Sequence, residues 1–360
     1  MTRKRVFAVS LGVLLFINIA VRAFFRLSPA ACESYARYIH PAVVSVFSPI
    51  TSVFPFSVIE FLIYAAILAV IIITAVLIVK KNRSGLRFFA KALLITLLTL
   101  GAVFLFNSEI NYMRLPFSYY ADIEVAPYDE TDILETIKYL SKKVETLEPQ
   151  TDENGVFVLS GDTLINRDSR AAMENLAADY PILTAFYPNP KPIFGSRMWL
   201  STGLITGVYS PFTLEANYND DSPAPDLPHT VCHELSHLTG FMREDEANFI
   251  AYLACIKSDN PDFVYSGCFS GLTHLVNSYH KSVDSETYGE MYAALPEQVK
   301  RDFAADNEYW EPFREKPRQK IADTANDTYL KVNGQADGVM SYGRCVDLIV
   351  NEARERGYSG

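Results

Sequence analysis

The chain has 360 residues, of which 49% are hydrophobic, and a formal net charge of −10 at pH 7. Residues 1–106 carry 11 of the 32 Lys and Arg but only 2 of the 42 Asp and Glu, a balance of +9, which leaves −19 for residues 107–360. A basic apolar part joined to an acidic part is typical of a membrane protein with a water-soluble domain. The pattern excludes a simple cytosolic enzyme, and the acidic part gives nucleic-acid binding no electrostatic support.

Three apolar runs, at 6–25, 58–79 and 88–106, lie in the first part of the chain. Each approaches or exceeds the about 20 residues that a helix needs to cross a bilayer. We therefore predict three transmembrane helices in a membrane domain of residues 1–106, with the lipid bilayer as partner. A cleaved signal peptide is the alternative for the first run, but that run is long and a second follows soon after it.

Basic residues flank these runs at Arg3–Arg5 and in the segment 80–87. With three spans both clusters fall on the same side, which the positive-inside rule makes cytoplasmic. We expect a multi-pass protein of the bacterial cell membrane with a cytoplasmic N-terminus and an extracytoplasmic domain at 107–360. The proline-rich loop 26–57 is expected to lie along the outer interface.

The second part of the chain reads as mainly helical. Helical spacing of apolar residues recurs at 129–147 and in most of the chain after Pro228, whereas 199–214 alternates and turns like one or two short strands. The predicted fold is therefore a mainly helical α+β domain with a small sheet. Five cysteines without a CxxC spacing argue against a disulfide framework, so buried free thiols are expected, although one disulfide stays open.

The segment most informative about chemistry is an HExxH motif, His233-Glu234-Leu235-Ser236-His237. Positions i and i+4 share one face of a helix, so both imidazoles can reach one zinc ion. Glu234 can then act as the general base on a metal-bound water. Pro228 before the motif and Gly240 after it are suitable helix start and stop signals.

A catalytic zinc site also needs a third protein ligand and an open position. Just past Gly240, Glu244, Ala247 and Asn248 form E-x-x-A-N on a second predicted helix. This arrangement resembles the gluzincins, the thermolysin-like and Ste24-like zinc peptidases. The resemblance implies Glu244 as the third ligand and Asn248 as the residue that holds a zinc-bound histidine.

The spacing departs from the gluzincin pattern, because only six residues separate Glu244 from His237. The short link with a glycine turn is closer to the metzincins, but their third ligand would fall at Arg243, which cannot bind a metal. Glu246 remains the alternative third ligand to Glu244. The two residues are two positions apart and therefore face different sides of a helix, so they are competing candidates.

A broader resemblance covers nearly the whole chain. It rests on Pro55–Glu60, Gly207–Asn217, HELSH with EDEANF, Tyr329–Gln335 and Ser341–Gly343. These segments resemble an uncharacterised bacterial membrane family, domain of unknown function 3810. That resemblance implies a zincin-like metalloprotease and gives no substrate.

The function we expect is therefore a membrane-anchored zinc metallopeptidase with one Zn²⁺ per chain and a peptide or protein substrate. The substrate would pair with an edge strand within 203–217, near Gly207 and Tyr209. The reaction also needs a hydrogen-bond donor for the developing oxyanion, and the sequence does not rank the candidates for this role. The candidates are Tyr329, Tyr342, His274 and His280.

Two further residues are expected to have structural roles, and two other functions remain as alternatives. We expect His229 to be a packing residue and Glu215 to be a solvated carboxylate. A zinc-stabilised binding or sensor domain without turnover is one alternative function, although only catalysis needs Glu234. A zinc hydrolase of cell-wall amides is another. Intramembrane proteolysis is disfavoured because the motif has charged neighbours and no long apolar run.

Overall fold

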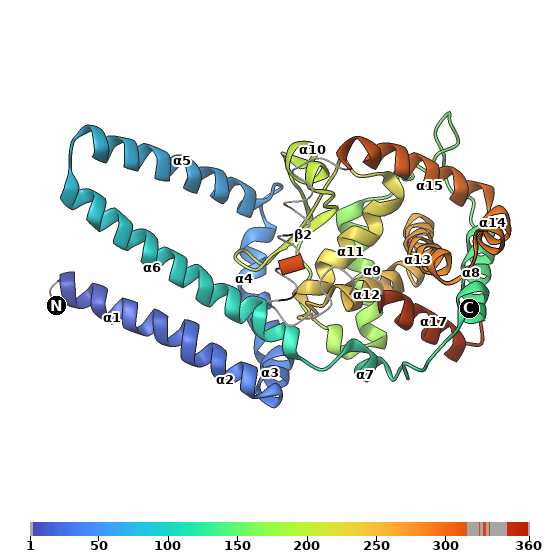
Figure 1. Ribbon diagram of the computed structural model, residues 1–360, viewed down its shortest axis with the longest axis horizontal. Coiled ribbons are helices and arrows are strands. Elements are labelled where there is room, and N and C mark those ends of the chain that lie inside the picture. The colour runs from blue at the N-terminus through green and yellow to red at the C-terminus, as the bar shows by residue number, and fades with distance from the viewer. Residues whose placement is uncertain (1–2, 315–323, 325–326, 329–330, 332–343, 359–360) are drawn as a thin grey trace.

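The computed structural model describes residues 3–314, 324, 327–328, 331 and 344–358 (Figure 1). Tyr329 and Tyr342 lie outside the described residues. Three helical segments near the N-terminus are long and apolar enough to cross a membrane, Arg5–Leu27, Val58–Val79 and Arg83–Met113. These helices confirm the three apolar segments predicted from the sequence.

The first of these candidate spans consists of α1 (Arg3–Phe16), a π-helical turn (Ile17–Val21) and α2 (Arg22–Leu27). The second is α5 (Val58–Val79), and the third is α6 (Arg83–Asn107) with a 3₁₀ turn (Glu109–Met113). A polar side chain caps the N-terminus of α5 and of α6. The Ser57 hydroxyl accepts a hydrogen bond from the Glu60 N–H, and the Asn82 side chain accepts one from the Gly85 N–H.

The first and third spans are held together by polar contacts. The Asn18 amide donates to the Leu98 carbonyl at 2.9 Å, and Glu109 pairs with Arg22 at 2.7 Å and with Arg26 at 2.8 Å. The second span, α5, runs apart from α6 toward the domain end in Figure 1. The first and third spans therefore pack side by side, whereas α5 meets α6 near the short loop that joins them.

The segment between the first two apolar helices is helical and not the loop that its prolines suggested. It forms α3 (Pro29–Ser34), a π-helical turn (Tyr35–Ile39) and α4 (His40–Ser52). Proline fits the first turn of a helix because the N–H there has no intrahelical partner. Val44 and Ser48 of α4 are fully buried, and the Ser48 hydroxyl donates to the Leu214 carbonyl at 2.7 Å.

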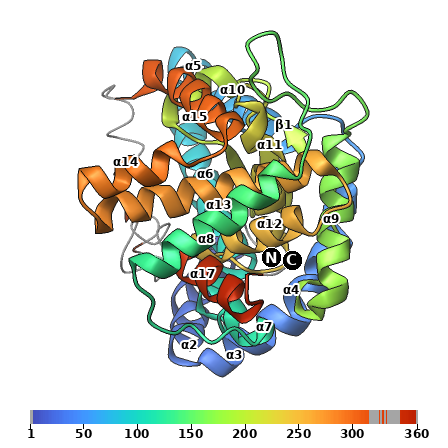
Figure 2. The same ribbon diagram turned by 90° about the vertical axis from the view of Figure 1, so that its right-hand side faces the viewer.

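The domain that follows is mainly helical, as predicted. Three helices form its centre: α11 (Leu227–Leu238), α12 (Glu244–Ile256) and α13 (Pro261–Ser282) pack on one another. Around them, α8 (Glu130–Glu145) packs on α13, and α9 (Ile165–Asp179) packs on α11 and α12 (Figure 2). Further α-helices of the described residues are α7 (Phe117–Ala121), α10 (Ser196–Trp199), α14 (Ser285–Ala293), α15 (Glu297–Trp310) and α17 (Cys345–Glu355).

A small sheet lies against α11. Its strands are β1 (Lys191–Pro192), β2 (Gly207–Ser210) and β3 (Glu215–Tyr218), in the order β1-β3-β2. β1 is parallel to β3, and β2 is antiparallel to it with Tyr209 opposite Ala216. In the part of the chain that the structure describes, β2 is thus an edge strand, as the predicted substrate-pairing segment requires.

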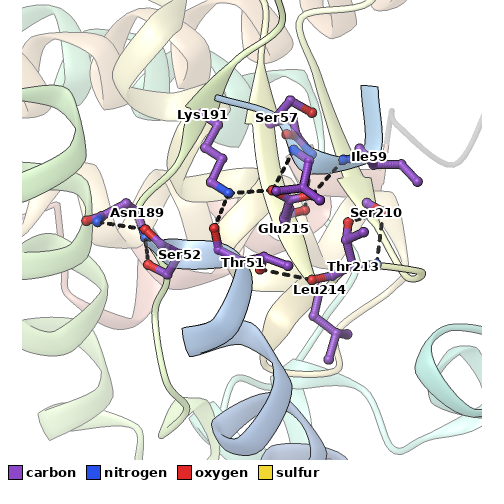
Figure 3. A network of polar contacts seen from close by, with 12 residues as sticks. Thr51, Ser52, Ser57, Ile59, Asn189, Lys191, Ser210, Thr213, Leu214 and Glu215 are labelled. Carbon is purple, nitrogen blue, oxygen red and sulfur yellow. Dashed lines mark hydrogen bonds and ion pairs between the residues drawn. The ribbon is translucent and has the colours of Figure 1, made fainter. Parts of the chain in front are cut away.

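A buried ion pair joins the sheet to the start of α5 (Figure 3). Lys191 of β1 and Glu215 of β3 are each 1% exposed and lie 2.5 Å apart. The Glu215 carboxylate also accepts the N–H groups of Val58 and Ile59, at 3.0 Å each, and Lys191 donates to the Thr51 carbonyl. The expectation of a solvated Glu215 is therefore wrong, because its partners come from segments far away in the chain.

All five cysteines are buried free thiols, as expected.

Candidate metal centre

The HExxH motif lies on α11, which ends in a glycine turn. Gly240 has a φ of +87°, and its N–H donates to the His237 carbonyl at 3.0 Å. This left-handed conformation favours glycine and lets the chain reverse into α12 four residues later. The turn brings the first residue of α12, Glu244, back to the histidines.

The structure brings three potential ligands together: His233, His237 and Glu244. One ligand atom from each lies within 4.8 Å of the others. His233 Nε2 lies 3.1 Å from Glu244 Oε2. Glu246 faces elsewhere, since it accepts the Phe117 N–H at 2.7 Å and pairs with Arg243. Geometry thus favours Glu244 over Glu246.

Both imidazoles are oriented by hydrogen bonds at Nδ1. His233 Nδ1 lies 2.8 Å from the Asn248 side-chain oxygen, and His237 Nδ1 lies 2.8 Å from the Phe241 carbonyl. These acceptors assign the proton to Nδ1 in each neutral ring, which leaves the Nε2 lone pair for a ligand. Asn248 therefore lies where the gluzincin resemblance implied.

His229 is buried, in agreement with the expected packing role, and makes two specific hydrogen bonds. Its Nε2 lies 3.1 Å from the Asn248 carbonyl, and its backbone N–H donates to the Ser266 hydroxyl at 3.0 Å. His229 thus ties α11 to the backbone of the residue that orients His233. The spacing of His229, one helical turn before His233, was the signal available in the sequence.

The electrostatics of the cluster follow from its burial. Burial alone would lower the pKa of His233, but the Glu244 carboxylate raises it to about 9. Burial and the charge of His233 lower the pKa of His237 to about 4. Burial raises the pKa of Glu234 to about 8, although the charge of His233 opposes this change. Without a cation, the Glu244 carboxylate is thus paired with a protonated His233.

The donor set suits one metal ion. Two imidazole nitrogens and a carboxylate are ligands of known catalytic zinc sites, and ligands of a tetrahedral ion at about 2.1 Å lie about 3.4 Å from one another. The cluster here is of that scale, and its outer hydrogen bonds leave the metal-facing atoms available.

The cluster opens into a cavity of about 960 Å³. His274, one of the candidate oxyanion donors, lines this cavity, as do Phe104 and Tyr112 from the third apolar segment. His280 is not among the lining residues; it is exposed and its ring lies 4.4 Å from that of Tyr288. The structure therefore does not bring His280 to the cavity: six residues after His274 on α13 is about 1.7 helical turns, which puts the two side chains on different faces of the helix.

Strand β2 lies beside Glu234. The Tyr209 N–H is hydrogen-bonded to the Glu234 carboxylate, and the Tyr209 ring lies 5.7 Å from that of His237. A Cβ at Gly207 would lie 2.5 Å from Glu234 Oε1, so glycine is needed for this close approach. The edge strand and the predicted base thus line the same cavity.

Comparison with known proteins identifies a family and no function. Residues 35–350 match the family described as "Protein of unknown function (DUF3810)". No curated protein matches the chain. No solved structure matches it either. Since the match covers most of the 360 residues, the chain belongs to this family of proteins of unknown function.

Proposed function

We propose that this protein is a membrane-anchored, zincin-like zinc metallopeptidase. The observation that carries the proposal is the convergence of His233, His237 and Glu244 around one point, with Glu234 in the same cavity. The basic flanks of the apolar helices favour a cytoplasmic N-terminus and an extracytoplasmic domain. The gluzincin-like use of Asn248 adds support, because its side chain orients His233.

A bound zinc ion would supply Lewis-acid polarisation of the scissile carbonyl and would lower the pKa of the attacking water. His233, His237 and Glu244 would hold that ion. Glu234, in the same cavity, would accept a proton from the attacking water and deliver it to the leaving amine. The outer edge of β2 would align the substrate as an added strand. Of the oxyanion donors predicted from the sequence, His274 is the one that lines the cavity within the described residues.

The test uses the full-length protein in detergent. We expect about one zinc per chain by elemental analysis, lost on Glu244→Ala and kept in Glu246→Gln, because Glu246 is committed to Phe117 and Arg243. Loss of zinc in Glu246→Gln with retention in Glu244→Ala would instead assign Glu246 as the ligand.

Catalysis is tested with Glu234→Gln and a pool of fluorogenic peptides. This variant should keep zinc and lose at least about 100-fold in cleavage rate, since a general base contributes about 10²–10⁴. Retained hydrolysis would exclude Glu234 as the base. A parent protein that holds zinc and cleaves nothing would favour the binding or sensor alternative.

A further inference from the structure

The strand that borders the cavity is fastened to the end of the third span. Asn107, the last residue of α6, donates through its side-chain amide to the Pro211 carbonyl at 2.7 Å. Its own carbonyl accepts from the Tyr209 hydroxyl at 3.1 Å. The loop between β2 and β3 therefore rests directly on the point where α6 ends.

The other strand of the same hairpin is fastened to the start of the second span. Glu215 of β3 accepts the N–H groups of Val58 and Ile59, the first two residues of α5 (Figure 3). Farther into this helix, Glu60 accepts the N–H groups of Phe194 and Gly195 at 2.8 and 2.9 Å. The β2–β3 hairpin thus connects the domain ends of the two apolar helices, between which it lies in Figure 1.

Apolar side chains are exposed around these two helix ends. One group borders the start of α5, where Gly195 lies beside Tyr64, and the other lines the cavity next to α6. Exposed apolar patches mark interaction surfaces, and Trp is enriched where proteins meet the bilayer interface. We call the two groups of exposed side chains together the apolar rim. Its residues are Phe194 (87% exposed), Met198 (58%), Trp199 (55%), Ile205 (36%), Val208 (37%) and Phe212 (42%).

The third apolar segment contributes directly to the cavity beside the hairpin. Phe104 and Tyr112 of the third apolar segment form part of the cavity wall. Within the described residues, no side chain in the most apolar window of α5 is buried. A membrane helix lying next to α5 and α6 would therefore meet unoccupied apolar surface that leads to the cavity.

From this arrangement we infer that the substrates are polypeptides anchored in the same bilayer by an apolar helix and cut at a bond close to the anchor. The inference rests on the proposed peptidase activity and names its substrate class. A chain that leaves the membrane beside α5 and α6 reaches β2 within a few residues, because an extended chain rises only about 3.3 Å per residue. Confinement to one bilayer also raises the effective concentration of such a substrate relative to one in solution.

The charge of the cavity agrees with this substrate class. Among its described lining residues the carboxylates are Asp226, Glu234 and Glu244, and two of these belong to the proposed catalytic cluster. Most other lining side chains near the span ends are apolar or aromatic. Such a wall suits the apolar residues that flank a membrane anchor.

The experiment uses the full-length protein with its zinc, reconstituted in phosphatidylcholine vesicles. Two peptide pools carry the same randomised ten-residue segment, one fused to a 20-residue Leu/Ala helix and one fused to a soluble Gly/Ser segment. We expect cleavage of the anchored pool to be at least about 10-fold faster, by a proximity effect of the kind that raises avidity. Mass spectrometry should place the cuts within the ten residues next to the anchor.

Equal rates for the two pools, with both abolished by Glu234→Gln, would overturn the inference and leave the peptidase proposal intact. No cleavage of either pool by zinc-loaded parent protein would contradict the proposed function itself, and the inference with it.

A pair of variants separates the rim from general stability. Trp199→Ser should reduce the preference for the anchored pool, because it removes an exposed apolar contact beside α5. Leu164→Ser is the matched control, since Leu164 is 54% exposed and lines a different pocket. An unchanged preference in Trp199→Ser and Phe194→Ser alike would remove the rim from the proposal.

Discussion

At the scale of single residues, Asn248 fixes the orientation of His233 and so the nitrogen that would face a bound metal ion. Its side-chain oxygen lies 2.8 Å from His233 Nδ1. We expect Asn248→Ala to weaken zinc affinity by about 10–100-fold, the usual effect of removing such a supporting hydrogen bond. Competition with a chromogenic chelator measures this affinity. Asn248→Asp keeps the acceptor and should remain close to the parent, whereas equal affinity in the alanine variant would contradict the role.

The core of the candidate site could be predicted from the sequence because its residues are close together in the chain. His233, Glu234 and His237 share a helix, and Glu244 follows after one turn. The partners that hold the sheet could not be predicted in this way. Glu215 is buried by contacts with Lys191 and with the start of α5, which no local pattern encodes.

At the scale of elements, the Lys191–Glu215 pair holds the sheet to α5. Both side chains are 1% exposed, so removal of one charge leaves the other buried without its partner. We expect Lys191→Met to destabilise the protein by about 3–5 kcal/mol, if it folds at all. Thermal unfolding in detergent measures the change. Lys138→Met is the control, because the Lys138–Glu135 pair is exposed and such pairs contribute about 0–1 kcal/mol.

A second contact between elements should make stability depend on pH. Asp226, at the start of α11, faces Asp306 of α15, and burial together with the Asp306 charge raises the pKa of Asp226 well above its usual value. The folded state therefore binds more protons than the unfolded state, whose Asp titrates near about pH 4. The unfolding free energy should accordingly fall as pH rises above this value.

Asp226→Asn should reduce that fall and stabilise the protein near neutral pH. Unfolding measured in detergent at several pH values between 4 and 8 tests this expectation. Glu308→Gln, an exposed change on the same helix α15, should leave the pH dependence unaltered. A steeper loss of stability in Asp226→Asn would show that the carboxylate is compensated by another group.

Element prediction succeeded where the pattern was strong and failed where proline dominated it. The second span was predicted at 58–79, and α5 has those bounds. Residues 26–57 were expected in a loop, yet Pro29 and Pro41 occupy first turns of helices, and Pro49 lies inside α4. A proline at a helix start is compatible with the helix, so composition alone could not separate the two outcomes.

At the scale of the whole molecule, the first 106 residues are not structurally separate from the rest. His40, Val44 and Ser48 of α4 are fully buried, and Val44 belongs to the same core as the helices of the metal centre. A fragment of residues 107–360 would expose that core. Measurements of zinc content and activity therefore call for the full chain.

Because every native cysteine is buried, we expect the protein to be unreactive toward bulky, water-soluble thiol reagents. All five thiols are buried, and burial raises the pKa of Cys268 to about 12, so the reactive thiolate is scarce as well as hidden. A single introduced cysteine would then report its location without removal of the others. Ser84 and Gly289 are both exposed, the first between the second and third spans and the second on α14.

With a membrane-impermeant maleimide on intact spheroplasts, we expect Gly289→Cys to react and Ser84→Cys to react only after lysis, as the positive-inside rule requires. The opposite result would put the metal centre on the cytoplasmic face. Because its five thiols are buried, the native chain can serve as the unlabelled control when single cysteines are used to map which side of the membrane each segment faces.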